Sequence, residues 1–172
     1  IMPCVGTEKL QWAGGRLLKQ LPCVQLDMNG IAQGYSIDVL ARFMESKGIE
    51  NYLVELGGEI RVKGRKQPGN SPMKIGIESP GSEPFGQTLI KKVLLLEKGA
   101  VTTSGSYRRF YESNGRRITH IIDPRTGTSI QNNLVSVTVM AEDAVTADAY
   151  DNALMVMGLE KGLQFAKKAH KI

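Results

Sequence analysis

Hydrophobic and polar positions follow two different periods along this chain. Met73–Glu78 and Leu134–Met140 alternate with a period of two, which predicts strands with one buried face. From Gly30 to about Lys47 apolar residues recur at helical spacing, and Gly48 follows as a natural stop, so this stretch predicts a helix. The apolar positions that define it are Ile31, Tyr35, Val39, Leu40, Phe43 and Met44.

Turn-forming residues separate further elements. Gly57–Gly58 predicts a turn between two strands, and Asn114–Gly115 is a strong hairpin signal. The mixture lacks a regular βαβ rhythm, so the predicted fold class is α+β, in a single domain over residues 1–172. The other expected strands are an extended run at Val24–Met28 and strands at Tyr52–Leu56, Glu59–Val62, Thr88–Glu97, Ala100–Ser104, Arg108–Glu112 and Arg117–Ile122; helices are expected at about Asp143–Met157 and Leu159–Ala169.

Composition narrows the class of protein. A chain of 172 residues with 41% apolar and 23% charged residues can bury one core, and no apolar run approaches the roughly 20 residues of a membrane-spanning helix. The net charge is +5, but the basic residues are scattered and not interleaved with aromatic residues, which weighs against nucleic-acid binding. Cys4 and Cys23 form no metal motif; a disulfide and two free thiols both remain open.

The junction from residue 27 to 38 is the first candidate site. Gly30 and Gly34 stand early in the predicted helix, where each costs about 1 kcal/mol relative to Ala. Glycine there lets a ligand approach the backbone, and a helix N-terminus favours a phosphate. The alternative is a loosely packed helix start, since the spacing matches neither the Rossmann nor the P-loop pattern.

Two further segments carry polar residues after predicted strands. Hydroxyl residues, Gly and two Arg at 102–109 can bind phosphate or ribose, although a turn into a solvated strand accounts for them better. His120 can act as a base or a phosphate ligand, or serve as a structural histidine. Asp123 begins the sequence DPRTG, whose composition favours a turn residue over a catalyst.

The last candidate lies on the predicted helix at 143–157. Asp148 and Asn152 are four residues apart and share a face, and Asp151 lies one turn from Asp148. Oxygen ligands on one helix face suit Mg²⁺. Spacing alone favours the alternative, a solvated polar face opposite an apolar side formed by Val145, Ala149, Ala153, Val156 and Met157.

In chain order these segments resemble one family, the ApbE-type FAD:protein FMN transferases. The resemblance covers about Gln25 to Leu163 and implies a central part of a longer domain that lacks N- and C-terminal parts. The similar stretches are LDMNGIAQGYSID, YLVELGGEIRVKG, VTTSGSYRRFYESNGRRITHIIDPRTG and VSVTVMAEDAVTADAYDNALMVMG.

The resemblance implies a Mg²⁺-dependent enzyme that splits FAD, attaches FMN to a Ser or Thr of a target protein and releases AMP. The implied acceptor is a flavoprotein such as a subunit of an ion-pumping redox complex. The implied location is the periplasm or cell envelope, with the full-length protein a membrane-anchored lipoprotein.

The resemblance also assigns roles to residues. Asp148 falls on the metal-binding carboxylate, Asn152 on a position that is usually a Thr ligand, and Gly30 on a metal-binding carbonyl. His120 falls on an active-site histidine that acts near the pyrophosphate or activates the acceptor hydroxyl. The segments that line the flavin site contribute Ser104, Gly105, Arg108 and Asp123.

Two departures from the family leave other functions open. Gln33 stands where the family commonly has Lys, which weakens a contact with the pyrophosphate, and Asn152 changes the metal ligand. Both favour a flavin-binding protein without catalysis. The sequence also leaves open an FAD pyrophosphatase, in which water replaces the hydroxyl acceptor.

Overall fold

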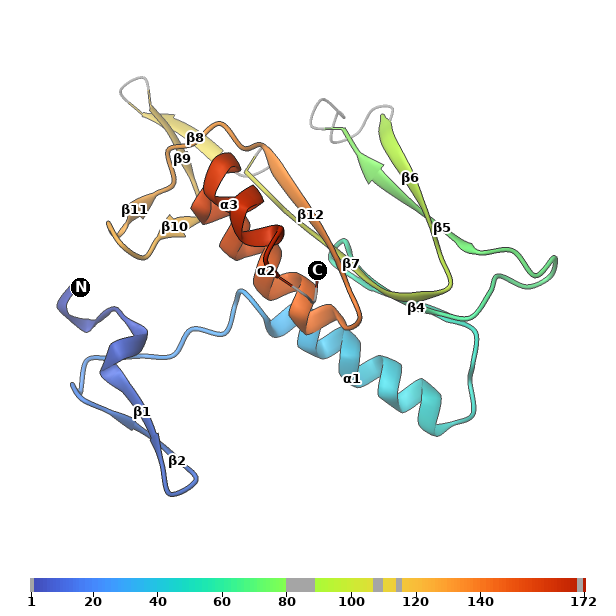
Figure 1. Cartoon of the computed structure of the whole chain (residues 1–172), viewed down its shortest axis with the longest axis horizontal. Helices are drawn as coiled ribbons and strands as arrows, with labels where there is room; N and C mark the ends of the chain where they lie inside the picture. The colour runs from blue at the N-terminus through green and yellow to red at the C-terminus, as the bar shows by residue number, and fades with distance from the viewer. Residues whose placement is uncertain (1, 80–88, 107–109, 114–115, 170–171) are drawn as a thin grey trace.

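The structure is a computed structural model that describes residues 2–79, 89–106, 110–113, 116–169 and 172 (Figure 1). Helices α1 (Ala32–Ser46) and α2 (Ala144–Met157) lie side by side against a sheet, and α3 (Leu159–Ala166) follows α2 directly. None of the helices in these ranges is long and apolar enough to cross a membrane.

The sheet that carries the helices has four antiparallel strands in the order β12-β7-β4-β3. Helix α1 packs on β3 and β4, and α2 packs on β7 and β12. Alternation along the strands places one set of side chains beneath the helices. The strands are β3 (Tyr52–Leu56), β4 (Glu59–Lys63), β7 (Lys98–Gly105) and β12 (Ser136–Ala141).

The apolar core fills the space between the two helices and this sheet. Small residues such as Ala41, Ala144 and Ala147 let the helices approach closely. A smaller cluster of Ile121, Ile130 and Met155 continues the core toward the end of α2. The buried residues of the main cluster are Ile37, Ala41, Tyr52, Val54, Ala100, Val139, Ala144, Ala147 and Leu154.

Helices α1 and α2 touch where both begin. A Cβ added at Gly34 would lie 2.4 Å from the Ala144 carbonyl oxygen and 2.9 Å from Asp148 Cβ, so only glycine fits there. This contact replaces both sequence-based interpretations of Gly34: the helix start is tightly packed, and what approaches the backbone is α2.

A buried carboxylate joins the two helices to the sheet. Asp38 of α1 is 2% exposed and accepts hydrogen bonds from the backbone N–H groups of Ala144 and Val145, each at 3.0 Å. These N–H groups belong to the first turn of α2, which has no intrahelical acceptors for them. Arg61 of β4 forms an ion pair with the same carboxylate.

Short antiparallel hairpins surround this core. In Figure 1 the β5–β6 hairpin projects away from the helices, and β1–β2 lies near the N-terminus. A disulfide between Cys4 and Cys23 brackets β1–β2, which answers the question that the sequence left open. The paired strands are β1 (Leu10–Ala13) with β2 (Arg16–Lys19), β5 (Met73–Glu78) with β6 (Ile90–Leu96), β8 (Phe110–Ser113) with β9 (Arg116–Thr119), and β10 (Ile122–Asp123) with β11 (Thr128–Ser129); two short 3-10 helices, η1 (Met2–Cys4) and η2 (Thr7–Lys9), precede them.

Most predicted elements are observed, but the strand predicted at Arg117–Ile122 is wrong in extent, because β9 ends at Thr119 and Ile122 begins β10, and β1, β2 and β11 were not predicted. The strand at Met73–Glu78 has the predicted bounds, and the three helices lie within their predicted ranges. The pairing of β8 with β9 confirms the hairpin, although Asn114 and Gly115 themselves lie outside the described residues. The extended run predicted at Val24–Met28 forms no strand in the described part of the chain.

The apolar periodicity of α1 marks an exposed side of the helix. Tyr35, Val39, Leu40 and Phe43 are 42% to 59% exposed, whereas the buried positions include Gly34, Ile37, Asp38 and Ala41. The helix was therefore predicted correctly from residues that mostly do not contact this core. Its packed side instead combines small residues, one isoleucine and a carboxylate.

We expect Asp38→Ala to lower the free energy of unfolding by about 3–5 kcal/mol, because it leaves Arg61 without its partner and removes the acceptor for two N–H groups of α2. Denaturant unfolding measures this change. Glu50→Ala, which removes an exposed carboxylate, should change stability by less than about 0.5 kcal/mol. A loss below about 1 kcal/mol for Asp38→Ala would contradict this role.

Candidate functional site

Three carboxylates meet below the crossing of α1 and α2. Asp148 and Asp151 come from α2 and are 2% and 1% exposed; Glu59 begins β4 and is 9% exposed. Spacing alone favoured a solvated face for Asp148, and that interpretation is wrong. The face that carries the two aspartates is the buried face of α2.

Strand register explains why Glu59 points at this place. Val54 lies opposite Arg61 and Leu56 opposite Glu59 in the β3–β4 pair, and residues opposite each other share a face of the sheet. Val54 belongs to the core beneath the helices, so Glu59 and Arg61 face the helices too. The polar positions of β4 thus meet the carboxylates of α1 and α2.

Asp148 is held by groups from both helices. Its Oδ2 accepts a hydrogen bond from the Gly34 N–H at 2.9 Å, and its Oδ1 accepts one from the Asn152 amide at 3.0 Å. Burial raises the pKa of Asp148, while the contacts with Gly34, Glu59 and Asn152 oppose that rise. Asp148 therefore caps the first turn of α1, as Asp38 caps α2.

Burial and neighbouring negative charges raise the pKa of the other two carboxyls. Burial raises the pKa of Glu59 to about 8, helped by the negative charges of Asp148 and Asp151 and by a hydrogen bond to Asp148. Burial raises the pKa of Asp151 to about 7, which the Thr102 hydroxyl opposes. At neutral pH the cluster thus carries less than its full negative charge.

Several buried oxygen atoms in this cluster have no hydrogen bond of ordinary geometry. These are Glu59 Oε2, Asp151 Oδ1 and Thr102 Oγ1. Buried polar atoms are nearly always satisfied by protein, water or an ion. The cluster therefore has unused capacity to bind a cation or ordered water.

Gly30, Ser104, Asp148 and Asn152, which the sequence resemblance assigned to the site, come together beside these carboxylates. The Asn152 amide nitrogen lies 3.5 Å from the Gly30 carbonyl oxygen and 3.0 Å from Asp148 Oδ1, and Ser104 Oγ donates to Asn152 Oδ1 at 3.2 Å. Carboxylate, carbonyl and amide oxygens are ligands that suit Mg²⁺. In the described ranges no group of three His, Cys, Asp or Glu could hold a metal ion, so a cation here needs the carbonyl and amide oxygens as well.

The remaining predicted site residues lie on other elements. Gln33 is exposed in the first turn of α1. It lies close to Gly57, because a Cβ added at Gly57 would be 2.3 Å from the Gln33 side-chain nitrogen Nε2. Gly105 ends β7 next to Ser104, and Arg108 lies outside the described residues. His120 is exposed between β9 and β10.

Asp123 holds a turn, as its local sequence indicates. Its carboxylate accepts hydrogen bonds from the backbone N–H of Arg125 at 2.9 Å and from the Arg125 guanidinium at 2.7 Å. These hydrogen bonds from Arg125 lower the pKa of Asp123. Arg125 also reaches the Val156 carbonyl at 3.5 Å, so the turn lies against the C-terminal end of α2.

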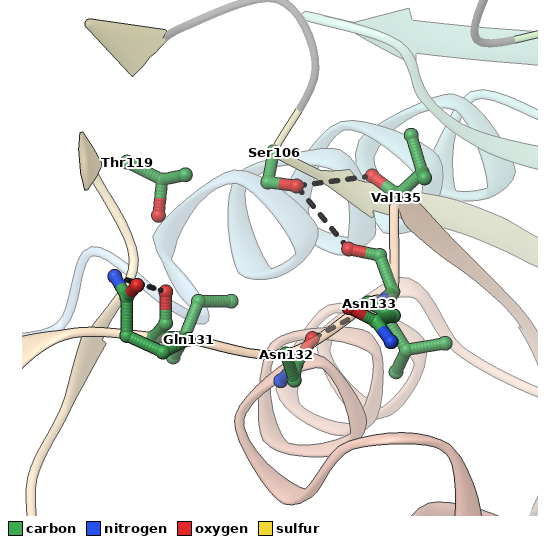
Figure 2. Close-up of a pocket in the computed structure, with 8 residues that line it drawn as sticks. Ser106, Thr119, Gln131, Asn132, Asn133 and Val135 are labelled. Atoms are coloured by element: carbon green, nitrogen blue, oxygen red, sulfur yellow. Dashed lines mark hydrogen bonds between the residues drawn. The ribbon is translucent and has the colours of Figure 1, made fainter. Parts of the chain in front are cut away.

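A cavity of about 450 Å³ opens at the same end of α2 (Figure 2). Ser106 donates to the Leu134 carbonyl, and the Asn132 amide donates to the Met155 carbonyl at 2.8 Å. Among the described residues the lining offers amides and hydroxyls, which suit a polar group of a ligand. It is formed by Ser106, Thr119, Ile130, Gln131, Asn132, Asn133, Leu134 and Val135.

Reasoning from the sequence missed Glu59, and it gave Thr102 only as one hydroxyl of the segment 102–109 and not as a neighbour of Asp151. Glu59 stands in a stretch that predicts only a turn and a strand. The available signal was the alternation of Glu59, Arg61 and Lys63 on one face of β4, opposite the partly apolar face of β3. This alternation indicates a buried polar cluster only if the helices cover that face of the sheet, which the sequence does not show.

Comparison with known proteins gives a consistent result. The ApbE family model matches residues 1–172. A FAD:protein FMN transferase from Vibrio cholerae serotype O1 is 43% identical over 162 residues, which is 94% of this chain and 47% of that protein. The FAD:protein FMN transferase of Escherichia coli K12 is 41% identical over 152 residues, or 88% of this chain and 42% of that protein.

Solved structures match the fold. The flavin transferase ApbE from Vibrio cholerae has a TM-score of 0.85 at 40% identity, covering 97% of this chain and 52% of that one. The apo form of the flavinyl transferase ApbE from Pseudomonas stutzeri has a TM-score of 0.83 at 39% identity, covering 97% and 50%. The α+β prediction is confirmed, and the chain spans about half the length of the proteins it matches.

The raised pKa of Glu59 predicts a pH-dependent stability in the presence of a chelator. An unfolded Glu loses its proton near its ordinary pKa of 4.5, whereas folded Glu59 keeps it up to about 8. The unfolded state therefore binds fewer protons in this range, and the contribution of Glu59 to stability falls as pH rises.

We expect Glu59→Gln, which mimics the protonated form, to become progressively more stable than the wild type between pH 4.5 and about 8. Urea unfolding at several pH values measures the difference. Glu160→Gln, which changes an exposed carboxylate on α3, should show no such trend. A constant difference between Glu59→Gln and the wild type would contradict the raised pKa.

Proposed function

The chain belongs to the ApbE family, and we propose that the protein transfers FMN from FAD to a Ser or Thr hydroxyl of a target protein, with release of AMP. The observation that carries this proposal is the convergence of Gly30, Ser104, Asp148 and Asn152 on one buried carboxylate cluster. The relatives named FAD:protein FMN transferase supply the reaction type.

We assign a Mg²⁺ site to this convergence. Asp148, the Gly30 carbonyl and Asn152 Oδ1 would hold the ion, and the unsatisfied oxygens of Glu59 and Asp151 would bind its waters. When bound, the ion supplies Lewis-acid stabilisation of negative charge on the FAD pyrophosphate. The hard oxygen donors of the cluster fit this ion better than a softer transition metal.

The protein side chains would then position the substrate and move one proton. A bond forms between the acceptor oxygen and the FMN-side phosphorus, and the bond from that phosphorus to the AMP oxygen breaks. His120 is the proposed acceptor of the hydroxyl proton. Gln33 offers an amide and no charge near the glycine turn at Gly57, so its contact with the pyrophosphate is weaker than that of a lysine.

The proposed acceptor is a flavoprotein such as a subunit of an ion-pumping redox complex. We place the protein in the periplasm or cell envelope, with a lipid anchor on the full-length form. The Cys4–Cys23 disulfide supports an oxidising compartment, because disulfides persist outside the reducing cytosol.

We expect Asp148→Ala to reduce Mg²⁺-dependent AMP release from FAD by about a hundredfold or more, since it removes the only charged ligand proposed for the ion. The assay compares AMP release with Mg²⁺ and with a chelator in the full-length protein. Glu160→Ala is the matched control with an exposed carboxylate on the next helix.

The products of that assay separate the candidate functions. AMP release with flavin bound covalently to an acceptor peptide supports the transferase. AMP release without covalent flavin supports an FAD pyrophosphatase, and FAD binding without AMP release supports a non-catalytic flavin-binding protein. Undiminished Mg²⁺-dependent release by Asp148→Ala would exclude the proposed metal site.

We expect His120→Ala to lower kcat for FMN transfer by about 10²- to 10⁴-fold with little change in FAD affinity, because a general base acts on the proton and not on binding. Quenching of flavin fluorescence measures the affinity. Thr128→Ala, an exposed residue of the neighbouring strand, should leave both quantities within about twofold. An unchanged kcat for His120→Ala would remove His120 from the reaction.

A further inference from the structure

The side-chain amide of Asn152 donates hydrogen bonds toward two proposed metal ligands. Its nitrogen lies 3.0 Å from Asp148 Oδ1 and 3.5 Å from the Gly30 carbonyl oxygen, and also 3.0 Å from the Asp148 carbonyl oxygen. An amide nitrogen carries two N–H donors and no acceptor. Asn152 thus presents its positive end to oxygens that would otherwise face a cation.

This orientation is incompatible with a bound cation. A Mg²⁺ ion must come within about 2.1 Å of its ligand oxygens, and a donating N–H group cannot stand in the same space. The oxygen of the same amide points to the other side, where it accepts from Ser104 Oγ at 3.2 Å. A cation therefore needs the amide to turn.

We propose that Asn152 is a reversible plug of the metal site, a role that rests on the Mg²⁺ site of the proposed function. In the metal-free protein its NH₂ group stabilises Asp148 and Gly30. On metal binding the amide turns by about half a rotation about its Cβ–Cγ bond and offers Oδ1 to the ion. The site is thus partly neutralised by the protein itself when no cation is present.

Ser104 makes both orientations of the amide possible. A hydroxyl can donate one hydrogen bond and accept others. In the present orientation Ser104 donates to Asn152 Oδ1; after the turn, the same hydroxyl accepts from the NH₂ group. The rotation therefore leaves no polar atom of this pair without a partner, so it is not opposed by a buried unsatisfied group.

Removal of the Asn152 NH₂ group should have two effects: lower stability without Mg²⁺ and tighter binding of Mg²⁺. We expect Asn152→Thr, which keeps an oxygen ligand but removes the NH₂ group, to lower Tm in a chelator and to tighten Mg²⁺ binding by about three- to tenfold. Differential scanning calorimetry measures Tm, and isothermal titration of the metal alone measures Kd. A purely structural Asn152 would instead give a lower Tm with unchanged or weaker Mg²⁺ binding, and this result would overturn the proposal.

Ser104→Ala is the matched control, because it removes a hydrogen bond from both orientations. It should lower Tm with and without Mg²⁺ and change the Kd for Mg²⁺ by less than about twofold. A loss of Mg²⁺ affinity as large as the gain in Asn152→Thr would contradict the equal role of Ser104 in the two states.

A measurement on the wild-type protein tests the plug without any substitution. The side-chain NH₂ resonances of Asn152 in a ¹⁵N–¹H spectrum should shift as Mg²⁺ saturates the site. Resonances that stay fixed at saturating Mg²⁺ would overturn the plug while leaving the metal site intact. No Mg²⁺ binding by either the wild type or Asn152→Thr would overturn both the plug and the metal site of the proposed function.

Discussion

Each of the two long helices is capped by a carboxylate of the other, and the remaining architecture depends on this exchange. Asp38 accepts from the first turn of α2, and Asp148 accepts from the Gly34 N–H in the first turn of α1. The two carboxylates have different neighbours. Arg61 neutralises Asp38, whereas Asp148 meets the neutral amide of Asn152 and the protonated Glu59. One cap is therefore paired with an opposite charge, while the other lies among acidic and amide groups whose buried oxygens include two without a hydrogen bond, Glu59 Oε2 and Asp151 Oδ1.

Local pattern predicted the elements well because local propensity and turn chemistry decide them. The strand at Met73–Glu78 and the helix stop before Gly48 follow from residues within a few positions. The pattern did not show which side of a helix is buried. On α1 the apolar side is exposed, and on α2 the side with Asp148 and Asp151 is buried, since the polar face of β4 supplies partners that no helical spacing can reveal.

The site itself was accessible only through resemblance. Nothing in the spacing of Gly30, Ser104 and Asn152 indicates that they meet, because a turn, a strand and a helix far apart in the chain supply them. The resemblance named these residues for one site, and the structure brings them together, but it gave no hint of Glu59, whose pKa burial raises to about 8. Gly34 shows the same limit: its role depends on how closely α2 approaches, which only the packed structure defines.

The contacts that make the site connect residues far apart in sequence, and this has a consequence for how the molecule folds. The hydrogen bonds from Ala144 to Asp38, from Gly34 to Asp148 and from Asn152 to Gly30 span 106, 114 and 122 residues. Such pairings close long loops before they contribute any stability, which slows folding relative to a chain with local contacts. The carboxylate cluster therefore exists only after the first turn of α1 and the first turns of α2 have come together across most of the chain. The two helix caps are therefore present together only in molecules that have completed this topology.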